Sequence, residues 1–296
     1  THRGSSAASD VYKRQFSSTV VKKKFKKIAG LTLIEILIAV VISSLMMAAM
    51  FTSYTIVNNT YRQVTDRAKL SQAGRDLIGQ LLREIRMAGY RFVNDDMAPD
   101  NDHVAIKITK GSGLEGGTCD KIQIVYGSVD YTSTAAEGER YEYTRYQITY
   151  ECEESTQVET LPDGSKQTID GFKILKSKKK WEIATNTFKT GLDDTLYEEE
   201  MVLDYVQDLI FVPFDANGKQ IGNQDPGNVV PGLANIESLR TVDIALIVRS
   251  TKPFYRENKN REVTSIYDSD RKIDHKTDKY LREIITVAAN ARNAGL

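Results

Sequence analysis

One apolar run constrains this chain more than any other feature. The stretch from Leu31 to Val57 contains a single charged residue, Glu35. Its last 22 residues, Ile36 to Val57, would form a helix about 33 Å long, which is enough to cross the hydrocarbon core of a bilayer. We therefore predict a membrane-spanning helix at residues 31–57.

The charge of the chain is unevenly distributed, although 40 basic and 40 acidic residues give a formal net charge of zero. Residues 1–30 hold eight basic residues and one acid, Asp10, which leaves 32 basic and 39 acidic residues for the remainder. Five of the eight lie within Lys22–Lys27, directly before the apolar run. Because positive charge beside a span favours the cytoplasmic side, we expect the bulk of the chain outside the cytoplasm.

Two other interpretations of the basic segment are a solvated or nucleic-acid-binding tail and a secretory signal peptide. The adjoining apolar run explains the lysines without nucleic acid, so we expect no nucleic-acid partner. The apolar part of a signal peptide is only about 7–15 residues long, which is shorter than this run. No Met precedes Met46, and we predict that residues 1–15 are a non-native remnant and residues 16–30 a basic leader.

Beyond Val57 the sequence becomes polar but keeps a helical period. Apolar residues recur at steps of three and four, at Leu70, Ala73, Leu77, Leu81, Ile85 and Ala88. No Pro interrupts residues 31–90, and Gly89 is suited to a helix C-cap. The pattern predicts that one helix continues through residues 58–90 and packs its apolar stripe against a globular head.

Residues 91–296 read as a strand-rich head. Val242, Ile244, Leu246 and Val248 alternate along one predicted strand, and the residues between them are apolar as well, which is typical of a central strand. The predicted strands are His103–Thr109, Lys121–Tyr126, Tyr141–Tyr150, Phe172–Leu175, Trp181–Ala184, Met201–Pro213, Thr241–Arg249 and Leu281–Ala289. We therefore predict an α+β fold, with a long N-terminal helix packed on an antiparallel sheet.

The segment Ala29–Glu35, AGLTLIE, resembles the processing site of type IV prepilins. The resemblance implies that a prepilin peptidase cleaves after Gly30 and that Leu31 is then N-methylated, although most members of the family have Phe at that position. It also implies that Glu35 pairs with the N-terminal ammonium of a neighbouring subunit. The physics agrees, because a carboxylate in hydrocarbon is costly unless it is paired or lies near the interface.

Four further segments resemble minor pilins of the PilW type: Arg83–Tyr90, Val202–Leu209, Leu239–Ser250 and Tyr280–Asn293. The resemblance implies a type IV pilus minor pilin that helps to initiate or cap assembly. Its partners would be other minor and major pilins, the prepilin peptidase and inner-membrane lipid. Two alternatives remain: a minor pseudopilin of type II secretion, of the GspJ type, and a membrane-tethered adhesin.

The two cysteines, Cys119 and Cys152, lie in the part that we expect to be exported, where disulfides persist. A disulfide between them is our prediction, and two free buried thiols are the alternative. No nucleophile, phosphate-binding or metal-ligating motif occurs in the sequence. We therefore expect a protein that is not an enzyme and needs no cofactor or metal.

Overall fold

The computed structural model describes residues 32–90, 105–111, 119–131, 134, 141–160, 164, 166–182, 184–192, 194–221, 229–230, 239–255, 257–260, 263–264, 272–273 and 277–292. By its internal contacts, the chain divides into two units, Thr1–Asn58 and Asn59–Leu296. The predicted cleavage residues Gly30 and Leu31 lie outside the described residues, as do residues 103 and 104 of the first predicted strand.

The first element is a helix of 55 residues, α1 (Leu33–Met87), whose residues belong to both units. The helix ends at Met87, three residues before the predicted end at residue 90, and Gly89 takes a left-handed φ of 75° that a residue with a side chain rarely adopts. The N–H of Gly89 then donates to the carbonyl of Val125 at 2.9 Å, which turns the chain onto the sheet.

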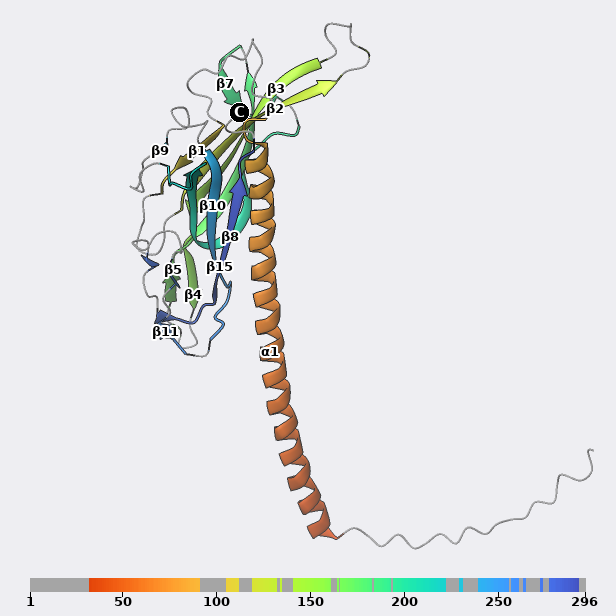
Figure 1. Ribbon diagram of the computed structural model, residues 1–296. Coiled ribbons are helices and arrows are strands. Elements are labelled where there is room, and N and C mark those ends of the chain that lie inside the picture. The colour runs from red at the N-terminus through yellow and green to blue at the C-terminus, as the bar shows by residue number, and fades with distance from the viewer. Residues whose placement is uncertain are drawn as a thin grey trace, which may run out of the picture. The chain divides into compact units, whose positions relative to one another are not determined.

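The strands of the second unit are almost all antiparallel neighbours, and Figure 1 labels most of them. The longest, β8, has 19 residues, whereas several of the strands have only two. Their bounds are β1 (Ile106–Thr109), β2 (Lys121–Tyr131), β3 (Tyr141–Glu154), β4 (Gln157–Thr160), β5 (Lys166–Ile169), β6 (Phe172–Glu182), β7 (Thr187–Lys189), β8 (Tyr197–Asp215), β9 (Val229–Val230), β10 (Leu239–Arg249), β11 (Lys259–Asn260), β12 (Val263–Thr264), β13 (Lys272–Ile273), β14 (Thr277–Asp278) and β15 (Arg282–Asn290).

The main sheet has nine strands in the order β15-β10-β8-β6-β3-β2-β1-β9, with β7 paired to β6. Strand β10 lies between β15 and β8, so the predicted central strand is central, as its two apolar faces require. The predicted α+β fold, one long helix followed by an antiparallel sheet, is therefore confirmed.

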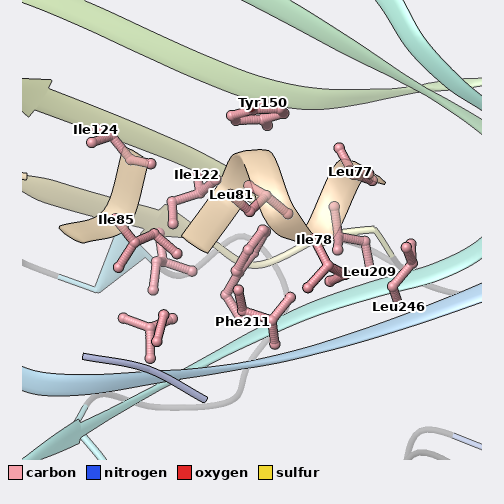
Figure 2. Close-up of a cluster of buried hydrophobic side chains, with 14 of the residues drawn as sticks. Leu77, Ile78, Leu81, Ile85, Ile122, Ile124, Tyr150, Leu209, Phe211 and Leu246 are labelled. Atoms are coloured by element: carbon pink, nitrogen blue, oxygen red, sulfur yellow. The ribbon is translucent and has the colours of Figure 1, made fainter. Parts of the chain in front are cut away.

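The core of the second unit forms between the C-terminal part of α1 and one face of the sheet. Leu77, Leu81 and Ile85 of the predicted helical stripe are buried, with exposed fractions of 1% or less. Figure 2 shows these side chains surrounded by residues of four strands, among them Ile122, Ile124, Tyr150, Leu209, Phe211 and Leu246. Full burial of an aliphatic side chain contributes roughly 1.5–3 kcal/mol, so this stripe holds the helix on the sheet.

The strand β8 changes partners halfway along its length. Its first half pairs with β6 and its second half with β10, so β6 leaves the other edge of the second half open. The β1–β2 connection closes that edge: the N–H of Asp120 donates to Leu209 at 2.8 Å, and Lys110 Nζ donates to the carbonyl of Phe211 at 2.6 Å. The N–H of Phe211 donates to Asp120 Oδ2 at 3.0 Å. We call these contacts the seam.

Candidate assembly site at the start of the helix

Thr32 and Glu35 form a reciprocal cap at the first turn of α1. The N–H of Thr32 donates to Glu35 Oε2 at 3.0 Å, and its hydroxyl lies 3.1 Å from the same oxygen. In return, the N–H of Glu35 donates to Thr32 Oγ1 at 3.3 Å. This is a capping box, in which a side chain on each partner satisfies backbone N–H groups that the helix leaves unpaired.

The cap determines the position of the Glu35 carboxylate and which of its oxygens can accept a further hydrogen bond. Its position in the first turn places the negative charge at the positive end of the helix dipole, which is favourable. Within the described part of the chain, recorded hydrogen bonds reach Oε2 alone, and the side chain is exposed. The carboxylate is therefore held in place by its own helix and keeps an oxygen that can accept from a cation.

Sequence reasoning missed the role of Thr32. The signal was present, since Thr followed three residues later by Glu before an apolar run is a recognised helix start. Gly30 and Leu31, which the resemblance assigns to processing, lie outside the described residues. Of the predicted assembly residues, the structure therefore places Glu35 alone and adds Thr32 as its partner.

The helix that follows this cap leaves its apolar side chains uncovered. In the first unit, large apolar residues from Leu33 to Val57 are about half to three-quarters exposed, for example Leu45 at 66%. The helix is long and apolar enough to cross a membrane, and none of its most apolar stretch is buried. A helix that is apolar on all sides needs lipid or other helices around it.

Four polar side chains of this stretch are satisfied within the helix. Each donates its hydroxyl to a backbone carbonyl three or four residues earlier, at 2.7–2.9 Å: Ser43, Ser44, Thr52 and Thr55. An unpaired hydroxyl in an apolar medium costs several kcal/mol, and these bonds remove that cost. The segment is therefore compatible with a surrounding of hydrocarbon.

In the second unit, one buried ion pair joins α1 to the sheet. Lys176 Nζ of β6 lies 2.7 Å from Glu84 Oε1, and both side chains are almost buried. Burial lowers the pKa of Lys176, but the hydrogen bonds and charges of Glu84 and Tyr197 together outweigh it, so the pKa lies above its ordinary value. Burial and the nearby charge of Glu84 raise the pKa of Tyr126 to about 12 and also raise the pKa of Tyr150.

Cys119 and Cys152 form a disulfide that joins the end of the β1–β2 connection to β3, with their Cα atoms 6.0 Å apart. The bond lies next to the seam, where Lys110 Nζ and Asp120 Oδ2 form a fully buried ion pair at 3.0 Å. The sequence did not indicate this ion pair. Both of its side chains also bond to the backbone of Phe211, which is about 90 residues away from Asp120 in the chain.

Comparisons with known proteins found a family motif and a structural neighbour. Residues 25–51 match the prokaryotic N-terminal methylation motif. Among solved structures, the chain is similar to a type IV-like pilin from Thermus thermophilus, with 12% identity and a TM-score of 0.45, over 77% of this chain and 97% of that one. No curated protein sequence gave a match. The chain thus combines an N-terminal methylation motif with a long apolar helix and an antiparallel sheet.

Proposed function

We propose that this chain is a minor pilin of the PilW type, which helps to initiate or cap a type IV pilus through its N-terminal helix. The observation that carries the proposal is the motif match at residues 25–51, which ends within the exposed apolar part of α1. A prepilin peptidase would cleave after Gly30 and methylate Leu31. The lysines of Lys22–Lys27 support an inner-membrane anchor with the sheet domain outside the cytoplasm.

The role of Glu35 in this proposal follows from charge and position. After cleavage, Leu31 would carry a new ammonium group, which needs a counter-charge in an apolar medium. The Glu35 carboxylate of a neighbouring subunit supplies such a charge at a fixed depth in the membrane. Its hydrogen bonds to Thr32 keep the carboxylate in one position. Pairing at this one position would set the axial stagger between adjacent helices.

Processing is the first test. The full chain is expressed in cells that contain a prepilin peptidase, and the intact mass of the purified protein is measured. We expect loss of residues 1–30 and one added methyl group on Leu31. Gly30→Ala should abolish both changes, whereas Gly79→Ala should leave them intact, since a Cβ at Gly79 meets nothing within 4 Å. An unprocessed wild-type chain would contradict the proposal.

Function is the second test, because the same motif also fits a GspJ-type pseudopilin of type II secretion. In the source bacterium, the gene is replaced by a Glu35→Gln variant, which keeps an acceptor for Thr32 but loses the charge. We expect normal cleavage and a marked loss of pili, with protein secretion unchanged. A secretion defect with normal pili would favour the pseudopilin. A loss of adhesion with both systems intact would favour a tethered adhesin.

A further inference from the structure

The strand β15 forms one end of the nine-stranded sheet. It pairs with β10 through nine consecutive residue pairs, from Thr241 with Asn290 to Arg249 with Arg282, without a shift in register. In the described part of the chain, β10 is the only strand that pairs with it. Figure 1 shows β15 in the head beside α1. Its outer edge is therefore a regular row of backbone groups.

The hydrogen bonds at the two ends of β15 show which of these groups face outward. The N–H of Ala291 donates to Arg240 at 2.9 Å, and the N–H of Ser250 donates to Leu281 at 2.8 Å, both in the register of the strand pair. Because bonded residues alternate in an antiparallel pair, odd-numbered residues of β15 bond to β10. The outward residues are Arg282, Ile284, Thr286, Ala288 and Asn290, and the last four are exposed.

This edge lacks the features that usually keep sheet edges from pairing. Residues 282–290 contain no Pro, Gly or Lys and no bulge. The charged residues are Arg282 and Glu283, and Arg282 is already bonded to Asp278 at 2.9 Å and to Gln207 at 3.3 Å. By contrast, the strand at the other end of the sheet, β9, has only two residues. Among the residues that the structure describes, the edge of β15 is thus open to another strand.

A second copy of the chain does not fit this edge. The α1 helix runs along β15 in the same direction, because Gln63 donates to the carbonyl of Phe254, just beyond β10, and a Cβ at Gly74 would meet Ile285. In an antiparallel two-fold pair, the two Asn59 residues would lie at opposite ends of the joined sheet. The two chains would therefore join their sheets at opposite ends, although in both the apolar run precedes Asn59.

A parallel two-fold pair fails for a different reason. In a parallel pair, a residue that bonds to the partner strand lies beside a residue that does not. When identical residues lie side by side, as a two-fold axis requires, one strand would have to bond through its odd residues and the other through its even residues. Two identical copies related by a two-fold axis would both present the even residues of β15. A parallel two-fold pair is therefore excluded, and an antiparallel one is disfavoured for chains that share one membrane, because it places the two Asn59 residues at opposite ends.

We propose that the edge of β15 accepts an extended strand from a different chain anchored in the same membrane. The partner would be a Pro-free segment of at least about five residues, uncharged opposite Ile284, Thr286 and Ala288, and bound mainly through its backbone. The choice of a partner in the same membrane rests on the function proposed above, whereas the open edge does not.

Residue-resolved amide hydrogen exchange tests the proposal. The full chain is compared in membranes of the source bacterium and after purification in detergent micelles. In micelles, the amides of Ile285 and Val287 should exchange slowly and those of Thr286 and Ala288 rapidly. In membranes, Thr286 and Ala288 should slow by about tenfold or more. Equal exchange in both preparations, or slow exchange of these two amides in monomeric protein, would overturn the proposal.

Two variants separate strand addition from general structure. Thr286→Pro removes an outward N–H and spares the bonds to β10, so it should abolish the slowing at Ala288, whereas Thr286→Val should preserve it. If Thr286→Pro fails to fold, Ala288→Lys places a charge on the edge without changing the backbone and should give the same loss. Slowing that persists in the blocked variants, or that accompanies a homodimer of the purified chain, would refute the proposal. Because Gly30→Ala tests processing separately, the two proposals can fail independently.

Discussion

The two parts of α1 differ in both apolar content and environment. Leu45 in the first part is 66% exposed, whereas Leu81 in the second part is fully buried. The first part is apolar on all sides, so it has no single face that could pack on a sheet. The second part carries one apolar stripe and presents charged residues elsewhere. The number of apolar residues and their arrangement around the helix together determine what surrounds each part.

The two parts of α1 each contain an acid, Glu35 and Glu84, and these differ in exposure and in bonding partners. Glu35 is bonded to its own helix and keeps an exposed oxygen, whereas Glu84 is almost buried and bonded to a distant strand through Lys176. The first acid is free to pair with something outside the subunit. The second is used within the subunit to fix α1 on the sheet.

Truncating a leucine in each part should produce the largest contrast. Leu81→Ala removes buried side-chain volume from the core and should lower the free energy of unfolding by about 2–5 kcal/mol. Leu45→Ala should leave it unchanged, because that side chain contacts little within the subunit. Urea unfolding of the purified chain in detergent, followed through Trp181 fluorescence, measures both. Equal losses would show that the first part also packs on the head.

Removing the charge of each acid should give an intermediate effect. Glu84→Gln leaves Lys176 charged and poorly paired, so we expect a loss of about 2 kcal/mol near neutral pH. Glu35→Gln should not change the unfolding of the head. The raised pKa of Lys176 means that this stabilisation is complete below the pKa of an unfolded lysine and disappears as the pH rises through the folded value. Urea unfolding as a function of pH should show this alkaline loss in the wild type and a weaker one in Glu84→Gln.

Two glycines within the second part should give the smallest effects, with different signs. Gly79→Ala should stabilise the chain by about 0.5–1 kcal/mol, because a Cβ there meets nothing and Ala favours the helix. At Gly74, a Cβ would lie 2.4 Å from Ile285 Cδ1, so that side chain must move. We expect Gly74→Ala to be less stable than Gly79→Ala by about 1–2 kcal/mol in the same urea assay. A stabilising effect of Gly74→Ala would contradict this and would mean that Ile285 of β15 moves aside at little cost.

Much of the fold was accessible from the sequence because local patterns determine it. The helix follows from its period and the absence of Pro, and β10 follows from its continuous apolar residues. The prediction of two strands at Phe172–Leu175 and Trp181–Ala184 was wrong, since β6 runs without a break from Phe172 to Glu182. The residues between the two predicted strands belong to β6, where Lys176 pairs with Glu84 and Lys178 lies over the ring of Tyr146.

The candidate site was predictable to a similar degree. Glu35 was recognised from the motif, and Thr32 could have been found from its spacing to Glu35. The buried pair of Lys110 and Asp120 could not, because their shared partner Phe211 becomes a neighbour only when β8 changes partners. Contacts between distant segments carry no local signal, so pattern reasoning misses them.

The seam has a consequence for how freely this head can vary. Gly111 and Cys119 are each fixed independently, by the bond from Gly111 N–H to Asp120 and by the disulfide to Cys152. The two residues that flank the segment 112–118 are therefore held by contacts outside that segment. Doubling the length of a connection costs only about 0.6 kcal/mol in closure entropy. This connection is thus a position where evolution or an experimenter can add sequence, such as a label or a new recognition loop, without loss of the fold.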